Sequence, residues 1–206
     1  MATINRITKL TDKKYVNLYQ ADGVNSKGYE SHYLIASRSE TVEGLKMNCG
    51  LTRPDAVAVY AVCDGKVVLV KQYRYPINAW IYELPAGLVE NGEDYHDTAV
   101  REMKEETGLD LEVIKVDPMI EKASFTSVGM SDESTATVYG YAAGVVSDRF
   151  EEASEEIEVV LADKEECMRI LREENVAMFC QYQLMHFISD DEPFGFLRTF
   201  QNGGSH

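Results

Sequence analysis

The sequence predicts an α/β fold in which a mixed β-sheet is flanked by helices. Residues 56–63 form a nearly continuous apolar run, which is typical of a buried strand. The Asp64-Gly65 pair that follows favours a tight turn into a second strand over residues 66–73. Residues 93–107 have the periodicity of an amphipathic helix, and Gly108 is placed to end it. Strands on both sides of such a helix indicate the α/β class.

The other elements follow from shorter patterns along the chain. Residues 14–20 and 31–37 are rich in Tyr, Val, Ile and Leu and are separated by turn residues, so they are predicted to form a hairpin. A short strand over residues 80–84 ends at Pro85. Beyond the predicted helix, the extended segments are residues 111–116, 134–146 and 157–161, and the helical ones are residues 163–172 and 177–188.

The predicted helix places apolar and acidic residues on neighbouring faces. The apolar face is expected to comprise Ala99, Val100, Met103 and Thr107. The acidic face comprises Glu102, Glu105 and Glu106. Clustered carboxylates suit a hard cation such as Mg²⁺ or Mn²⁺, whereas a solvated acidic surface is the alternative.

Composition limits the classes of function. At 206 residues with 45% hydrophobic residues, the chain is long enough for one domain, or one domain plus an extension. The net charge of −15 argues against nucleic acid as a partner. The four cysteines are widely spaced, so we expect them to be reduced and mostly in the core. The absence of an apolar leader or an 18-residue apolar run predicts a cytoplasmic protein without a membrane partner.

Residues 87–109 resemble the signature of the Nudix hydrolase family, G-x5-E-x7-R-E-U-x-E-E-x-G-U, where U is aliphatic. Every fixed position is filled, with Met103 as an apolar residue at the first U; the matching residues are Gly87, Glu93, Arg101, Glu102, Met103, Glu105, Glu106, Gly108 and Leu109. The resemblance implies the Nudix α/β/α sandwich over residues 51–190. Residues 1–50 would then be an amino-terminal antiparallel β extension, and residues 191–206 a carboxy-terminal tail.

Three further stretches are similar to the ADP-ribose pyrophosphatase branch of that family. Residues 71–87 match its QYR and E-x-P-A-G lead, residues 124–133 its S-P-G-x-S-x-E loop, and residues 151–160 its late acidic loop. Val128 stands where ADP-ribose hydrolases usually have a proline, so GDP-mannose or another nucleoside diphosphate sugar stays open as substrate. In this branch the amino-terminal extension commonly builds a homodimer, which we therefore expect here.

The resemblance also implies roles for the acidic helix. Glu102 and Glu106 would bind Mg²⁺ or Mn²⁺ directly, Glu105 would bind or support a second ion, and the Ala86 carbonyl would add an oxygen. Arg101 would orient the carboxylates through charge-assisted hydrogen bonds, with a surface ion pair as the alternative. Glu93 is expected to support the loop.

The catalytic base is expected from the late acidic loop. Glu155 is the first choice and Glu152 the second, whereas Glu151 and Glu156 are the other two candidates. At least two of these four are expected to be ordinary solvated charges.

Five residues are candidates for contact with the substrate. Arg74 suits phosphate oxygens, although an ordinary surface arginine is the alternative. Trp80 would stack on a nucleobase, as would Tyr73, but core packing is the competing interpretation. Glu83 would bind substrate or support the loop, and Glu133 would approach a ribose.

These observations lead to a first hypothesis and two competitors. The first is a Mg²⁺-dependent pyrophosphatase that splits a nucleoside diphosphate sugar, ADP-ribose first, into a nucleoside monophosphate and a sugar phosphate. The second is a house-cleaning hydrolase of damaged nucleoside triphosphates. The third is a non-catalytic ligand sensor with the same fold, which would be expected to lack some of the carboxylates.

Overall fold

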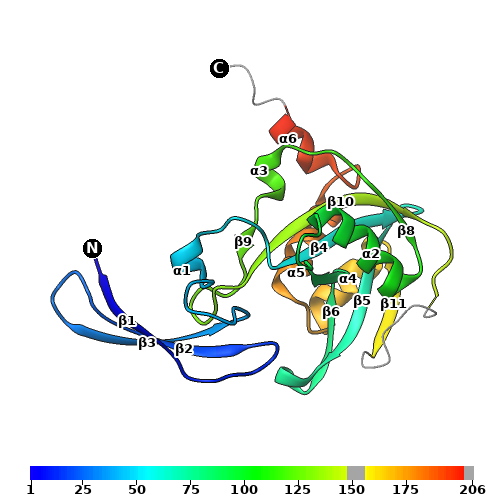
Figure 1. Ribbon diagram of the computed structural model, residues 1–206. Helices are drawn as coiled ribbons and strands as arrows, with labels where there is room; N and C mark the ends of the chain where they lie inside the picture. Colours follow the sequence, from blue (N-terminus) through cyan, green and yellow to red (C-terminus); the bar gives the residue numbers. More distant parts are fainter. Residues whose placement is uncertain (148–155, 202–206) are drawn as a thin grey trace. The chain divides into compact units, whose positions relative to one another are not determined.

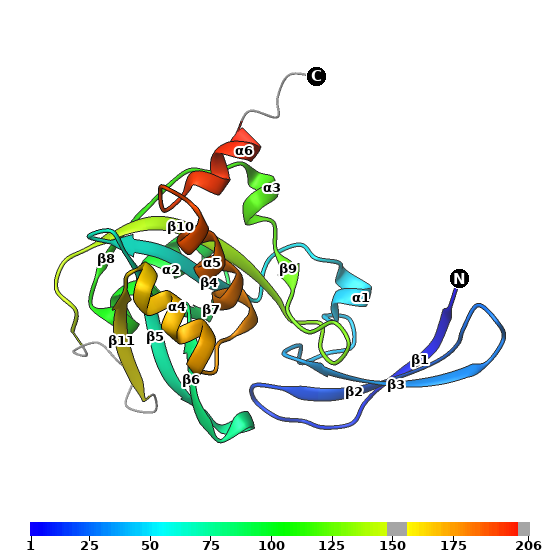
Figure 2. The same cartoon turned by 180° about the vertical axis from the view of Figure 1, so that it is seen from behind.

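The computed structural model describes residues 1–147 and 156–201, and the chain divides into two compact units. The first unit comprises residues 1–55 and 123–135, and the second comprises the described residues of 56–122 and 136–206. Figure 1 and Figure 2 label the elements of both units.

The first unit is built on a three-stranded antiparallel sheet. Its strands lie in the order β1 (Thr3–Lys9), β2 (Asn17–Val24) and β3 (Glu30–Ser37). A small apolar cluster around Tyr19, Ile35 and Leu45 covers one part of this sheet. The unit also contains the short helix α1 (Lys46–Cys49) and the strand β9 (Ser124–Phe125). The predicted hairpin is present as β2 and β3, whereas β1 is an additional strand.

The second unit contains the larger sheet, whose main path runs β11-β5-β4-β10-β8. The bounds of these strands are β4 Ala56–Cys63, β5 Lys66–Arg74, β8 Asp110–Val113, β10 Ser134–Ala143 and β11 Ile157–Ala162. Three more strands extend the sheet, since β6 (Ala79–Glu83) pairs with β5, β7 (Ala86–Leu88) pairs with β4, and β9 pairs with the start of β10.

Helices cover both faces of this sheet. The main ones are α2 (Tyr95–Thr107), α4 (Lys164–Glu173) and α5 (Met178–Ser189); α2 lies in front of the sheet in Figure 1, and α4 and α5 lie in front of it in Figure 2. Alternate residues of β4 explain this layering, because Val57 and Val59 pack in the cluster with α2 whereas Ala58 and Tyr60 pack in the cluster with α4 and α5. The predicted α/β class, with a mixed sheet between helices and an antiparallel amino-terminal sheet, is confirmed.

Residues near the carboxy-terminal end of the second unit contribute to its hydrophobic core. The short elements here are η2 (Gly195–Leu197) and α6 (Arg198–Gln201); η1 (Tyr75–Ile77) and α3 (Pro118–Glu121) are the other short helices of the unit. Phe194 packs against Tyr60, and Leu197 is buried in the same core cluster, although both residues belong to the predicted tail of residues 191–206. Among residues 1–147 and 156–201, no helix combines the length and the apolarity needed to cross a membrane.

The cysteines agree with the expectation from their spacing. All four are free, and Cys63, Cys167 and Cys180 are buried, whereas Cys49 is exposed. Burial raises the pKa of the Cys167 thiol to about 12, which keeps it protonated and unreactive.

Candidate active site on the acidic helix

Local sequence signals define the ends of the acidic helix α2. Asp94 accepts a hydrogen bond from the backbone N–H of His96 at 2.9 Å and caps the first turn. Gly108 ends the helix with a φ of 75°, a left-handed conformation that glycine adopts without strain. The buried face includes Ala99, Met103 and Thr107, as predicted. Val100 was expected on the same face, but it is 41% exposed, because it follows Ala99 by 100° of helical rotation and points away from the sheet.

Two of the acidic side chains lie against neighbouring residues of β7. The backbone N–H of Ala86 donates to Oε2 of Glu106 at 3.1 Å, and Glu106 is buried. A Cβ placed on Gly87 would overlap the carboxylate of Glu102, so this carboxylate occupies the space that the glycine leaves open. The structure thus brings Ala86, Glu102 and Glu106 together.

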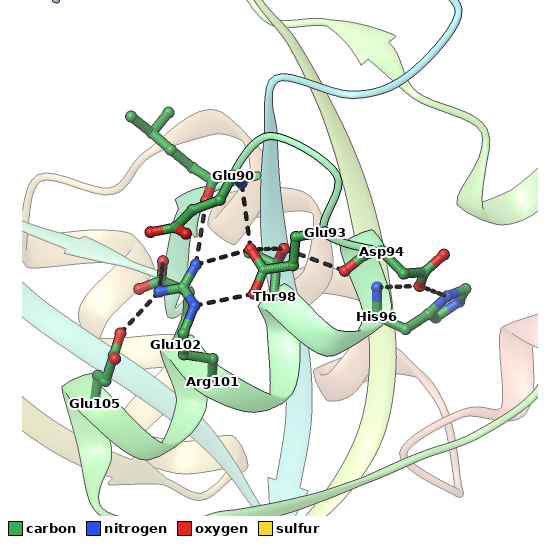
Figure 3. A network of polar contacts seen from close by, with 9 residues as sticks. Glu90, Glu93, Asp94, His96, Thr98, Arg101, Glu102 and Glu105 are labelled. Atoms are coloured by element: carbon green, nitrogen blue, oxygen red, sulfur yellow. Dashed lines mark hydrogen bonds and ion pairs between the residues drawn. The ribbon is translucent and has the colours of Figure 1, made fainter.

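Arg101 provides the positive charge within this cluster (Figure 3). Its Nη1 donates to Oε1 of Glu102 and to Oε2 of Glu105, at 2.8 Å each. Its Nε donates to Oε1 of Glu93 at 3.1 Å, and its Nη2 donates to Oε2 of the same residue at 3.2 Å. Nη2 also reaches the carbonyl of Leu88 at 3.3 Å. One guanidinium therefore contacts three carboxylates and the backbone beside β7.

The Glu93–Arg101 pair has a clear electrostatic signature. The hydrogen bonds from Arg101 lower the pKa of Glu93 from 4.5 to about 2. Reciprocally, Glu93 raises the pKa of the Arg101 guanidinium above its ordinary value. Both side chains are therefore fully charged at neutral pH, which strengthens the bonds between them.

Thr98 and Glu90 belong to the same network but were not singled out from the sequence. The Thr98 hydroxyl donates to Oε2 of Glu93 at 2.8 Å, and the backbone N–H of Glu90 donates to the same oxygen at 3.2 Å. A usable signal existed for Thr98, because it precedes Glu102 by four residues and Glu105 by seven. It thus falls on the acidic face.

Arg74 and Glu83, both predicted to contact substrate, are bonded to each other. Arg74 donates to Oε2 of Glu83 from Nε at 2.9 Å and from Nη2 at 2.6 Å. The two side chains are 47% and 17% exposed, respectively. The guanidinium therefore already has a partner, and a phosphate would have to share it with this carboxylate.

Trp80 is at the surface of β6. It is 36% exposed and packs edge-on against Tyr73, with ring centroids 5.8 Å apart. The ammonium of Lys71 lies 5.7 Å from its ring centroid. Part of the indole is thus accessible for stacking, and a cation lies beside it.

The remaining predicted residues belong to other parts of the chain. Glu133 is in the first unit, where Arg38 donates to it from Nε at 2.6 Å. Glu152 and Glu155 lie outside the described residues.

The fold and the site define a class of protein: an α/β sandwich in which a glycine-flanked acidic helix packs on a central strand pair. The model of the NUDIX domain matches residues 52–178, and the chain belongs to this family. It is 36% identical over 126 residues to an ADP-ribose pyrophosphatase of Bacillus subtilis, which is 60% of this chain and 65% of that protein. It is 47% identical over 81 residues to a methanol dehydrogenase activator of Bacillus methanolicus, which is 39% of this chain and 42% of that protein.

Two further comparisons agree with this assignment. The chain is 37% identical over 97 residues to an ADP-sugar pyrophosphatase of Mus musculus, which is 45% of this chain and 44% of that protein. The crystal structure of an ADP compounds hydrolase has the same fold, with a TM-score of 0.65, 16% identity and 91% of both chains covered. The matched segments span less than two thirds of these curated relatives.

Hydrolases of this family generally need a divalent metal ion. The candidate donors are carboxylate and carbonyl oxygens, which are the ligand types that Mg²⁺ and Mn²⁺ prefer. Within the described part of the chain, no group of three or more His, Cys, Asp or Glu side chains is already arranged to hold a metal ion. Instead, Glu102 and Glu105 contact Arg101, and Glu106 accepts from Ala86. The donor set fits the metal chemically, and the observed arrangement is the one stabilised by Arg101.

Proposed function

We propose that this chain is a Mg²⁺-dependent pyrophosphatase of nucleoside diphosphate sugars, with ADP-ribose as the first candidate substrate. The observation that supports this most is the placement of Glu102 and Glu106 against adjacent residues of β7, with Arg101 beside them. The curated relatives named ADP-ribose pyrophosphatase and ADP-sugar pyrophosphatase support the substrate class.

Each residue would have a definite part in the hydrolysis. Glu102, Glu106 and the Ala86 carbonyl would hold the metal, and Glu105 would bind or support a second ion. The bound metal would neutralise charge on the diphosphate oxygens and assist the attacking water. Arg101 would keep the carboxylates in position through its hydrogen bonds.

The base would be Glu155, with Glu152 as second choice. It would take a proton from the water that attacks one phosphorus atom. The P–O bond to the bridging oxygen would break, which yields a nucleoside monophosphate and a sugar phosphate.

Arg74, Glu83 and Trp80 are the proposed substrate contacts in the second unit. In the first unit, Glu133 is proposed to approach a ribose. Arg74 would share its guanidinium between Glu83 and a phosphate oxygen, because its Nε and Nη2 already donate to the Glu83 carboxylate. The accessible part of Trp80 would stack on the base.

A second candidate, GDP-mannose or another nucleoside diphosphate sugar, is favoured by one observation. Val128 replaces the proline that is usual in ADP-ribose hydrolases, and its side chain is 70% exposed in a loop of the first unit. Residues 127–133 differ from the S-P-G-x-S-x-E loop of the ADP-ribose pyrophosphatase branch at this position alone. The proposed substrate class is therefore still a nucleoside diphosphate sugar, whereas its sugar and its base are not specified.

The decisive experiment measures hydrolysis with Mg²⁺ of ADP-ribose, GDP-mannose and a panel of nucleoside triphosphates. We expect the diphosphate sugars to be cleaved faster, with the nucleoside monophosphate as product. Activity on triphosphates alone would favour the house-cleaning hydrolase, and no cleavage of any compound would favour the non-catalytic sensor. Either result would overturn the proposal.

The metal assignment is tested by Glu106→Gln, which keeps the side-chain volume and removes the charge. We expect a loss of about 10²-fold or more in kcat with normal folding, which is the scale of losing a key catalytic group. The matched control is Glu112→Gln on the exposed surface of β8. Near-normal turnover of Glu106→Gln would contradict the assignment.

We also propose that the first unit forms a homodimer. Its sheet exposes Ile4, Tyr33 and Leu34, each about half accessible, which is a large apolar area for a small unit. Light scattering at micromolar concentration should give twice the mass of the chain, and a monomer would remove this proposal. A cytoplasmic location and a lack of nucleic-acid and membrane partners stay predictions.

A further inference from the structure

The buried hydroxyl of Thr98 has a defined acceptor. The side chain has no solvent exposure and lies in the first turns of α2. Its Oγ1 is 2.8 Å from Oε2 of Glu93 and 3.2 Å from the carbonyl oxygen of Asp94. A threonine hydroxyl has a single proton, and the shorter contact is to a charged oxygen, so the main bond is to Glu93. The bond to Glu93 and the contact with the Asp94 carbonyl hold this donor in one place.

Glu93 links Thr98 to Arg101. Oε2 of Glu93 accepts from Thr98, from Nη2 of Arg101 and from the backbone of Glu90, and the bond from Thr98 is the shortest of the three. Oε1 accepts from Nε of Arg101 at 3.1 Å. Thr98 and the guanidinium of Arg101 therefore both restrict the rotation of the Glu93 carboxylate. Figure 3 shows the bonds that they make to it.

Arg101 transmits this orientation to the acidic side chains. A guanidinium is planar, so two nitrogens bound to Glu93 determine where the third one points. That third nitrogen, Nη1, is the one that binds Glu102 and Glu105. A rotation of Glu93 would move Nη1 relative to both carboxylates.

We infer that Thr98 is a positioning residue for the candidate metal site and acts through Glu93 and Arg101. This inference rests on the proposed function only in that the acidic face binds a divalent cation. The Thr98 hydroxyl bonds to Glu93 and lies near the Asp94 carbonyl, neither of which is a proposed metal ligand. It sets the angle at which the guanidinium is presented to Glu102 and Glu105. Loss of the hydroxyl should weaken cation binding without unfolding the helix.

The first test measures Mn²⁺ affinity by the electron paramagnetic resonance signal of the free ion. Thr98→Val keeps the shape and removes the hydroxyl, Thr98→Ser keeps the hydroxyl, and Thr137→Val removes a buried hydroxyl from β10 as a matched control. Partners that bond directly to metal ligands change affinity by 10–100-fold; since Thr98 is more remote, we expect a rise in Kd of about 3- to 10-fold for Thr98→Val. Thr98→Ser and Thr137→Val should stay within about twofold of the native protein.

The second test needs neither metal nor substrate. The Nε–H resonance of Arg101, assigned with Arg101→Lys, should be protected from exchange in the native protein in EDTA. It should exchange faster in Thr98→Val and recover in Thr98→Ser, whereas a change in helix packing alone would not be rescued by serine. An unchanged resonance in Thr98→Val, or an unchanged Mn²⁺ affinity in a protein that binds Mn²⁺, would overturn the proposal.

Failure of the proposed function would look different. If no diphosphate sugar is cleaved but Thr98→Val still weakens Mn²⁺ binding and exposes Arg101, the positioning role stands and the assigned reaction fails. If cleavage is observed and neither readout moves, the reaction stands and the positioning role fails. If the native protein binds no Mn²⁺, the acidic face is not a cation site, and the positioning role fails whatever the Arg101 resonance shows.

Discussion

The Glu93–Arg101 pair allows a quantitative prediction for Glu93→Gln. The substitution keeps the size of the side chain and removes the charge that accepts both bonds from the guanidinium. We expect it to lower the free energy of unfolding of the metal-free protein by about 2 kcal/mol at pH 7.5.

The magnitude follows from the lowered pKa of Glu93. A fall in the pKa from 4.5 to about 2 corresponds to at most about 3.5 kcal/mol, because a tenfold change in an acid constant is worth about 1.4 kcal/mol. The side chain is 20% exposed, and solvent weakens the interaction, so we reduce this to about 2 kcal/mol. A pKa that is lowered on folding gives a stabilisation that is complete above pH 4.5 and disappears as the pH falls towards 2.

Urea unfolding in EDTA, followed by circular dichroism, measures the difference between native protein and variant. The difference should be about 1 kcal/mol smaller at pH 3.5 than at pH 7.5, because at pH 3.5 Glu93 is largely protonated in the unfolded chain but still ionised in the folded protein. Glu112→Gln is the control, and an exposed substitution of this kind should change stability by no more than about 0.5 kcal/mol. A loss below about 0.5 kcal/mol at pH 7.5, or a difference that grows as the pH falls, would refute the argument.

Three other outcomes are expected. Gly87→Ala should displace Glu102 while the fold is kept, so kcat for the preferred substrate should fall by about 10²-fold with little change in the urea midpoint; normal kcat would contradict the role of this gap. Gly108→Ala should cost about 1–3 kcal/mol in urea unfolding, because φ is 75° and the new Cβ would lie 2.8 Å from Ser147; an unchanged midpoint would contradict this. Removal of metal with EDTA should abolish hydrolysis but leave the circular dichroism spectrum unchanged, and activity in EDTA would exclude a metal requirement.

The elements that sequence predicted well have strong local signals. Strand β4 is apolar on both faces, which identifies it as a buried strand. Helix α2 has an apolar periodicity, and Asp94 and Gly108 mark its two ends. Strand β1 was missed because its residues are exposed or only half-buried and show no apolar alternation. The four-residue helices α1 and α3 were missed because one turn is too short to display a period.

The candidate site was predictable in composition but not in its contacts. The signature identified Glu102 and Glu106, and their common proximity to β7 follows from the packing of α2 on that strand. The pairing of Arg74 with Glu83 was not visible, because it depends on how β5 and β6 pair. The sequence alone does not specify whether the Arg74 guanidinium bonds to the Glu83 carboxylate or is free to bind a phosphate.

The position of Arg101 changes how the acidic helix should be understood. The sequence pattern favoured a hard cation among the clustered carboxylates, yet Nη1 of Arg101 already contacts Glu102 and Glu105 at 2.8 Å each. With Glu93 included, three carboxylates face one guanidinium, so minus three plus one leaves a charge of minus two. Arg101 therefore offsets part of the repulsion among these carboxylates, and the remaining negative charge would attract a divalent cation. If Glu102 and Glu106 hold a divalent ion, as proposed, Glu93 would keep Arg101 beside them through its two hydrogen bonds to the guanidinium.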